Sequence, residues 1–134
     1  MIRVLIAEAD PVLRSIYQAF LVGEDIETRT ADSALTCLEQ LRAWRPDILV
    51  LDSDLPAGAG PGVLALMRDD PSAGRVGVLL LTAPAAVGGE AGLRGDFAVM
   101  LKPAPPAVLA GVIRTLADAG WGDRGQRPSL VELA

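Results

Sequence analysis

The sequence contains no histidine and only one cysteine, Cys37, among its 134 residues. Without histidine the chain cannot supply a Ser-His-Asp triad, an imidazole metal ligand or a phosphohistidine. A single cysteine excludes an internal disulfide and a zinc site built from thiolates, and it is typical of a protein in a reducing compartment. We expect Cys37 to be a small apolar filler of the core rather than a redox sensor.

Aromatic residues are also scarce, at 4%, although 51% of the residues are hydrophobic, so the core has to be built from aliphatic side chains. Twelve basic residues against seventeen acidic ones give a formal net charge of −5, which disfavours nucleic acid and anionic membranes as partners. The most apolar stretch, from Val76 to Leu81, is far below the ~20 residues of a membrane-spanning helix. Glu8 and Asp10 interrupt the first apolar run before it resembles a secretory leader, so we expect a cytoplasmic protein.

Five short aliphatic runs alternate with helical patterns along the chain. Residues 26–30 alternate in polarity like a strand at a sheet edge, and the other runs are nearly continuous, as strands covered on both faces should be. The continuous runs are Ile2–Ala7, Ile48–Leu51, Val76–Leu81 and Phe97–Leu101. This alternation predicts an α/β fold, and we expect a flavodoxin-like doubly wound sheet of five parallel strands in the order 2-1-3-4-5, with helices on both faces.

The helices are predicted from apolar spacing and from their caps. Leu13, Ile16, Tyr17 and Phe20 share one helical face, and Asp10-Pro11 is a typical helix start. Further helices are indicated around residues 34–41, 63–67 and 108–116, whereas four glycines within residues 84–95 predict a short or irregular helix there. We assign residues 1–118 to one domain and residues 119–134 to a C-terminal tail or linker, in which residues 129–133 are compatible with one helical turn.

Polar residues follow the predicted strands at the points where these end. Because the carboxyl ends of parallel strands meet at one edge of a sheet, we expect these side chains to converge. Clustered carboxylates repel one another unless a divalent cation or a lysine neutralises them, and the set suits phosphoryl transfer onto Asp52. The residues are Glu8, Asp10, Asp52, Asp54, Thr82 and Lys102.

Over about residues 1–118 the chain resembles a response-regulator receiver domain. In that family an aliphatic strand runs into an acidic cluster, as residues 4–11 do, and the phosphoacceptor aspartate lies in an aliphatic-Asp-x-x-x-Pro-x-x-x-Gly frame, as residues 48–60 do. The hydroxyl and small residue that follow its fourth strand match Thr82-Ala83. Its Lys-Pro pair, joined by a cis peptide bond, matches Lys102-Pro103.

The resemblance implies that Asp52 accepts a phosphoryl group from a histidine kinase, a phosphotransfer protein or a small phosphodonor, using Mg²⁺. It also implies that Lys102 contacts the phosphoryl group and that Thr82 moves toward it, which remodels a surface bound by a downstream protein. On this interpretation the chain is a signalling module of a two-component system or phosphorelay, able to form a homodimer. It is not an enzyme beyond autocatalytic phosphoryl transfer and autodephosphorylation at Asp52.

The metal-binding acids depart from the family pattern. Ala9 stands where the family has the acid that ligates Mg²⁺ directly, and Glu8 is one methylene longer than the usual aspartate. Asp52 and the backbone carbonyl of Asp54 belong to the metal site in the family. The side chains of Asp54 and Asp10 are candidate replacement ligands. Because Mg²⁺ demands near-octahedral geometry, we expect weakened metal binding.

The switch region departs as well. Val99 stands at the position of the aromatic ring that turns inward when Thr82 moves, and the segment before Lys102 is short and rich in glycine. A second hypothesis is therefore a pseudo-receiver, a protein-interaction or dimerisation domain that works without phosphorylation. A third starts from Asp52-Ser53-Asp54, which resembles the nucleophile loop of haloacid-dehalogenase phosphatases, although that loop follows the first strand and needs further acids and a cap. A flavin site is disfavoured because aromatic residues are scarce.

Overall fold

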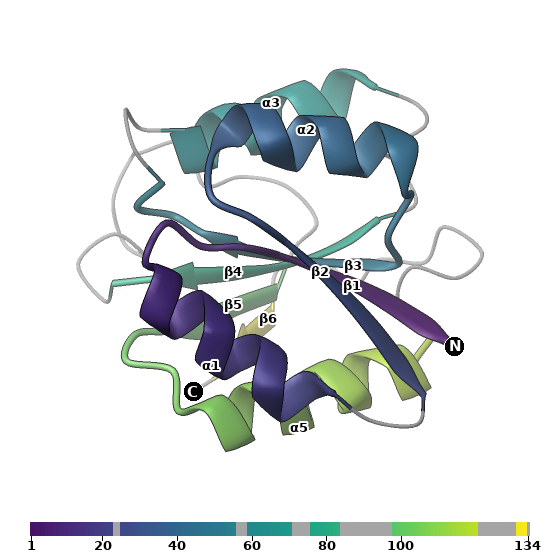
Figure 1. The fold of residues 1–134 in the computed structure, drawn as a ribbon, viewed down its shortest axis with the longest axis vertical. Coiled ribbons are helices and arrows are strands. Elements are labelled where there is room, and N and C mark those ends of the chain that lie inside the picture. Colours follow the sequence, from purple (N-terminus) through teal and green to yellow (C-terminus); the bar gives the residue numbers. More distant parts are fainter. Residues whose placement is uncertain (23–24, 56–58, 71–75, 84–97, 121–130, 134) are drawn as a thin grey trace.

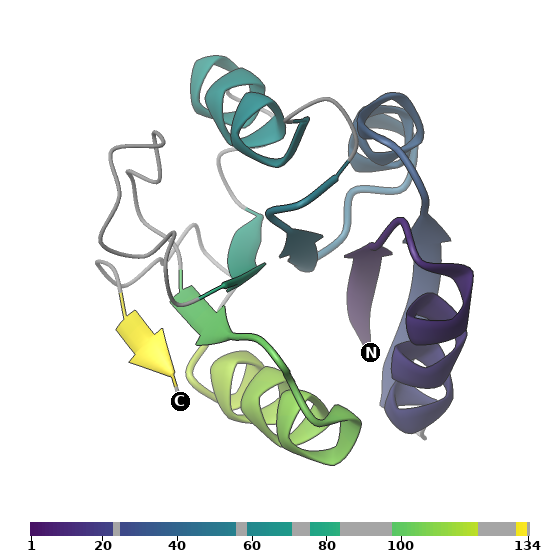
Figure 2. The same ribbon diagram turned by 90° about the vertical axis from the view of Figure 1, so that its left-hand side faces the viewer.

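A parallel sheet lies between two layers of helices in the computed structural model, which describes residues 1–22, 25–55, 59–70, 76–83, 98–120 and 131–133 (Figure 1). Helices α2 and α3 cover one face of the sheet, and α1 and α5 cover the other (Figure 2). The strands are β1 Ile2–Ala7, β2 Ile26–Ala31, β3 Ile48–Asp52, β4 Gly77–Thr82, β5 Ala98–Leu101 and β6 Val131–Leu133. The helices are α1 Pro11–Leu21, α2 Ala34–Ala43, α3 Ala59–Asp69 and α5 Pro106–Asp118.

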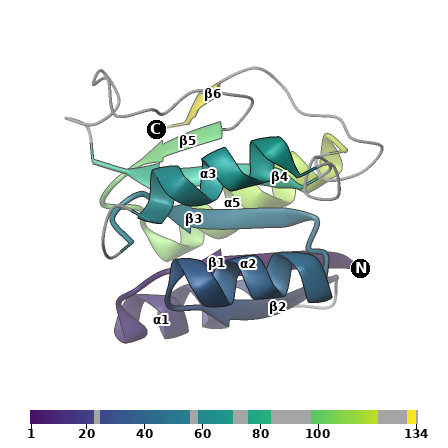
Figure 3. The same cartoon turned by 90° about the horizontal axis from the view of Figure 1, so that it is seen from above.

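The strands follow the order β2-β1-β3-β4-β5-β6, and every neighbouring pair is parallel (Figure 3). The predicted order 2-1-3-4-5 is therefore confirmed for the first five strands. The expected helical turn at residues 129–133 is wrong for residues 131–133, which pair with β5 as a sixth strand. Without this pairing, β5 would be an edge strand with unpaired backbone N–H and C=O groups. Residues 131–133 satisfy these groups as a strand, which a single turn of helix would not do. The short helix expected within residues 84–95 lies outside the described residues.

The helix starts are stabilised by the caps that the sequence indicates. Asp10 accepts hydrogen bonds from the amides of Val12 and Leu13, at 2.8 and 3.3 Å, and thus serves as the N-cap of α1. At α2, Ser33 and Thr36 form a reciprocal capping box, with each side chain accepting from the other's backbone N–H at 3.2 Å. These local contacts set where α1 and α2 begin.

Successive residues of the central strands divide between two cores, one on each face of the sheet. Both β3 and β4 are buried along their whole length, as near-continuous aliphatic strands should be. Under α2 and α3 the core includes Leu5, Leu49, Leu51, Leu80 and Cys37, and under α1 and α5 it includes Val4, Ile6, Val50, Leu79 and Tyr17. Cys37 is fully buried, and burial raises the pKa of its thiol to about 12, which leaves almost no reactive thiolate at neutral pH.

Helix α1 forms as predicted, but its apolar face is only partly covered. Tyr17 and Leu21 are buried, whereas Leu13 and Ile16 are each 37% exposed and Phe20 is 48% exposed. Spacing alone places these residues on one face and does not say how much of that face a neighbouring helix covers. Within the described ranges, no helix combines the length and the hydropathy that crossing a bilayer requires.

Candidate functional site

The candidate site lies at the carboxyl edge of the sheet, where the predicted polar residues come together. Asp52 is the last residue of β3, Thr82 the last of β4, and Lys102 follows β5 directly. Backbone hydrogen bonds continue past the strand ends, from Ser53 N–H to the Leu81 carbonyl and from Lys102 N–H to the Thr82 carbonyl, each at 2.9 Å. This continued pairing holds Asp52, Thr82 and Lys102 at the ends of three neighbouring strands.

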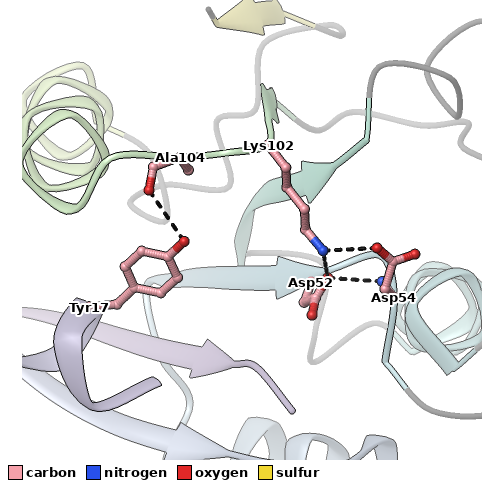
Figure 4. A network of polar contacts seen from close by, with 5 residues as sticks. All are labelled: Tyr17, Asp52, Asp54, Lys102 and Ala104. Atoms are coloured by element: carbon pink, nitrogen blue, oxygen red, sulfur yellow. Dashed lines mark hydrogen bonds and ion pairs between the residues drawn. The ribbon is translucent and has the colours of Figure 1, made fainter. Parts of the chain in front are cut away.

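Asp52 and Lys102 form the centre of the site (Figure 4). The Lys102 ammonium Nζ lies 2.5 Å from Oδ1 of Asp52 and 2.9 Å from Oδ2 of Asp54. The backbone N–H of Asp54 also donates to Oδ1 of Asp52, at 2.9 Å. Burial pushes the pKa of Asp52 upward, but hydrogen bonds from Glu8 and Lys102 outweigh burial and hold this pKa below its ordinary value. Asp52 is therefore a buried, ionised carboxylate next to an ammonium group.

Glu8 lies against Asp52 and is only 5% exposed. Burial, followed by hydrogen bonding to Asp52, raises the pKa of Glu8 from 4.5 to about 8. At neutral pH the Glu8 carboxyl is therefore largely protonated and able to donate to Asp52. In this state the buried pair of carboxyl groups carries a single negative charge, which lies next to the Lys102 ammonium.

Three buried oxygen atoms in this region have no hydrogen-bond partner in the described part of the chain. They belong to Glu8, to Ser53 next to the central aspartate, and to Thr82, which is completely buried. Each such atom costs about 1–3 kcal/mol unless something satisfies it, and their grouping at one sheet edge is typical of a binding site. The Thr82 hydroxyl therefore makes no structural hydrogen bond within the described residues.

The loop after β5 is tied to α1 by a contact that sequence reasoning missed. The peptide bond between Lys102 and Pro103 is cis, as the resemblance implies. The Tyr17 hydroxyl then donates to the carbonyl of Ala104 at 3.3 Å (Figure 4). Helical spacing marks Tyr17 only as an apolar-face residue, and no local signal identifies a partner 87 positions away.

Arg14 is a second residue that the sequence did not single out. Its guanidinium donates to the carbonyl of Glu8 at 2.9 Å and to that of Ala9 at 3.4 Å. The side chain thus reaches back from α1 and holds the loop between β1 and α1. No sequence signal distinguishes this arginine from an ordinary exposed one.

Ala9 packs against the aliphatic core and offers no side-chain donor to a metal. The Asp54 carboxylate is engaged by Lys102, and the Asp10 carboxylate caps α1. Across the ranges that the structure covers, no group of three or more His, Cys, Asp or Glu side chains is arranged to hold a metal. Glu8 and Asp52 still offer hard oxygen donors, and one oxygen of Glu8 is buried without a partner among the described residues, so the two carboxyl groups fit Mg²⁺.

Val99, at the position of the family's switch aromatic, is 3% exposed and belongs to the core under α2 and α3.

Asp52 follows the third strand and not the first, which differs from the nucleophile loop of haloacid-dehalogenase phosphatases. A parallel sheet in this order, with an aspartate, a threonine and a lysine at the carboxyl edge, defines a receiver-type α/β domain.

Comparison with known proteins identifies the family. A family model described as the response regulator receiver domain matches residues 4–114. The chain therefore belongs to the response regulator receiver domains, modules of two-component signalling that are generally not enzymes. Domains of this family interact with histidine kinases or phosphotransfer proteins and with downstream effectors.

Two curated relatives differ in how much of their length the chain matches. The chain is 34% identical to the transcriptional regulatory protein CseB of Streptomyces coelicolor, over 96% of this chain and 56% of the relative. It is 28% identical to the polar-differentiation response regulator DivK of Brucella anthropi, over 87% of this chain and 97% of the relative. The chain thus spans about half the length of CseB, and likewise of the DNA-binding response regulator MtrA of Mycolicibacterium smegmatis.

Solved structures agree with this fold. A putative response regulator from Chloroflexus aurantiacus superposes with a TM-score of 0.73 at 25% identity, over 87% of this chain and 97% of that one. The chemotaxis response regulator CheY4 of Vibrio cholerae gives a TM-score of 0.74 at 20% identity, over 87% and 98% of the two chains. At 20% identity the second similarity shows the fold alone.

Proposed function

We propose that Asp52 accepts a phosphoryl group and that the phosphorylated domain presents a changed surface to a downstream protein. The observation that carries this proposal is the pairing of an ionised, buried Asp52 with the Lys102 ammonium at 2.5 Å. The hydroxyl of Thr82, which has no hydrogen-bond partner among the described residues, lies at the same edge of the sheet. The phosphodonor is a histidine kinase, a phosphotransfer protein or a small acyl phosphate.

In the proposed reaction, a carboxylate oxygen of Asp52 forms a bond to phosphorus while the bond between phosphorus and the donor atom breaks. The leaving group takes the electron pair, and Asp52 becomes an acyl phosphate. The Lys102 ammonium offsets the charge on the phosphoryl oxygens, and the Thr82 hydroxyl donates a hydrogen bond to them afterwards. The protein promotes the transfer through positioning and charge stabilisation rather than through acid–base chemistry.

Mg²⁺ in this site would be held by Glu8, Asp52 and the backbone carbonyl of Asp54, and it would neutralise charge on the transferred group. We propose that it binds more weakly than is usual, because Ala9 contributes no carboxylate and Glu8 is held as a largely neutral acid against Asp52. Ala9→Asp is then expected to tighten Mg²⁺ binding at least tenfold, measured by isothermal titration calorimetry.

The direct test is incubation with acetyl phosphate and Mg²⁺, followed by intact-protein mass spectrometry. We expect one added phosphoryl mass in the wild type and none in Asp52→Asn. Asp69→Asn, which removes an exposed carboxylate at the end of α3, should still be modified. Absence of the adduct across a broad range of Mg²⁺ concentrations, or its persistence in Asp52→Asn, would refute the proposal.

The pseudo-receiver remains the second candidate, favoured by the core packing of Ala9 and Val99. It predicts that a physiological partner binds the wild type and Asp52→Asn equally, with or without beryllofluoride and Mg²⁺. Under this hypothesis Ala9→Asp tightens metal binding without any effect on that partner. A partner affinity that depends on Asp52 and on metal would exclude it, and chromatography with light scattering would show whether the partner is a second copy.

A further inference from the structure

Lys102 is the only lysine in the chain, and two carboxylates share it. Its ammonium donates to Asp52 at 2.5 Å and to Asp54 at 2.9 Å (Figure 4). Asp54 contacts both of the other residues, since its carboxylate accepts from Lys102 and its backbone N–H donates to Asp52. The three residues thus form a closed triangle in which Lys102 cannot leave Asp54 without losing a charged hydrogen bond.

The three side chains differ in depth. The Asp52 side chain is 7% exposed, that of Lys102 is 30% exposed, and that of Asp54 is 70% exposed. Asp54 therefore holds its negative charge on the solvent side of Lys102, while Asp52 lies on the buried side. A phosphoryl group that arrives from solvent meets the Asp54 charge first and then competes with Asp54 for the ammonium.

We infer that the carboxylate of Asp54 is a positioning residue that retains Lys102 and lowers the affinity of Asp52 for a phosphoryl group. This inference rests on the proposed function. An ammonium group has three N–H donors, and in the resting site two of them are engaged by carboxylates. Removing the Asp54 carboxylate releases one donor to the phosphoryl oxygens and deletes a repelling charge. The competing interpretation is the one left open above, in which this side chain replaces the missing metal ligand.

The substitution Asp54→Asn separates these two interpretations. Beryllofluoride in the presence of Mg²⁺ is the probe for the phosphoryl group, and Mg²⁺ alone is the probe for the metal, both measured by isothermal titration calorimetry. A positioning role predicts that beryllofluoride binds about two- to fivefold more tightly, the range expected for losing one exposed ion pair, while the affinity for Mg²⁺ changes less than about threefold. If both affinities fall tenfold or more, Asp54 is a metal ligand and the inference is wrong.

A second readout does not depend on phosphoryl chemistry. Because the chain has one lysine, an amine-acylating ester followed by peptide mass mapping reports the freedom of the Lys102 amine directly. We expect about two- to fivefold faster acylation of Lys102 in Asp54→Asn, and a near wild-type rate in Asp54→Glu, which keeps the charge. Unchanged acylation in Asp54→Asn overturns the inference whatever the ligand titrations show.

Two controls separate the effect of Asp54→Asn from a failure of the proposed function. Asp69→Asn removes one exposed carboxylate away from the site and should change neither the acylation rate nor beryllofluoride binding. If the wild type fails to bind beryllofluoride, the proposed function fails, yet the acylation experiment still tests whether Asp54 retains Lys102. Asp54 is exposed, so its variants are expected to fold, and far-ultraviolet circular dichroism checks this.

Discussion

The hydroxyl of Tyr17 donates to the carbonyl of Ala104 across 3.3 Å and thereby joins helix α1 to the loop that follows Lys102. Tyr17 is the only tyrosine in the chain, and both residues of the pair are buried. The contact fixes the backbone two residues after the lysine, between the cis peptide bond and the start of α5. A residue from the first helix thus supports the side chain that reaches Asp52.

Substituting Tyr17 by phenylalanine should lower the free energy of unfolding by about 1–3 kcal/mol. The change removes one donor and leaves the buried Ala104 carbonyl without this hydrogen bond, while the ring stays in the core. Urea unfolding followed by circular dichroism measures the effect. Phe20→Tyr is the matched control, since it adds a hydroxyl at an exposed position of the same helix and should change little. Equal stability of Tyr17→Phe and the wild type would mean that the hydrogen bond contributes nothing.

Replacing Thr82 by valine should have opposite effects on stability and on ligand binding. Valine has nearly the same shape, and the Thr82 hydroxyl is buried without a partner in the described residues, so its removal should stabilise the domain by ~1 kcal/mol. The same variant should bind beryllofluoride several-fold more weakly, because the proposed donor to the phosphoryl group is lost. Thermal unfolding and calorimetry test both parts, and a clear loss of stability would contradict the first.

The raised pKa of Glu8 makes stability depend on pH in a defined window. Burial and the hydrogen bond to Asp52 raise this pKa from 4.5 to about 8 in the folded state, so protonation favours folding. The contribution is complete below pH 4.5 and is lost as pH rises through about 8. Asp52 does not disturb the window, because its pKa is held below its ordinary value and its charge changes only in more strongly acidic solution.

Glu8→Gln tests this dependence, since glutamine is neutral and can still donate to Asp52. Relative to the wild type, we expect its free energy of unfolding to gain about 2 kcal/mol or more between pH 5 and pH 8.5. The measurement is the difference between two urea unfolding curves at each pH, in which the other titrating groups cancel. A difference that does not vary with pH would show that Glu8 is already ionised at neutral pH.

Trp44, the C-cap residue of α2, contacts two arginines that lie in β1 and β2. The guanidinium of Arg29 lies 4.9 Å from the ring centroid and that of Arg3 lies 5.7 Å away, while the indole N–H donates to Glu27 at 3.3 Å. Arg29→Met keeps the aliphatic stem but removes the charge over the ring and the exposed hydrogen bond to Gln40, so it should destabilise the domain by about 0.5–1 kcal/mol. Arg42→Met, at an exposed position near the end of α2, is the control and should be neutral. Equal effects of the two substitutions in urea unfolding would exclude a specific interaction with the ring.

Much of the fold and the approximate site follow from the sequence by itself. Continuous aliphatic runs predict buried parallel strands, and Asp10 before Pro11 predicts the start of α1, because these signals act within a few residues. The positions of Asp52, Thr82 and Lys102 also follow, since a parallel sheet brings the carboxyl ends of its strands to one edge. Periodicity and strand order are sufficient for this level of description.

Only the tertiary structure determined which side chains contact one another across the sequence. The sequence indicated the Asp54 carboxylate only as a candidate metal ligand, whereas in the fold it accepts a hydrogen bond from Lys102, 48 residues away. The links from Tyr17 to Ala104 and from Arg14 to the Glu8 carbonyl, and the pairing of residues 131–133 with β5, were likewise invisible in the sequence. Such contacts depend on side-chain rotamers and on distances between segments that only the packed chain brings together, and no local spacing encodes them.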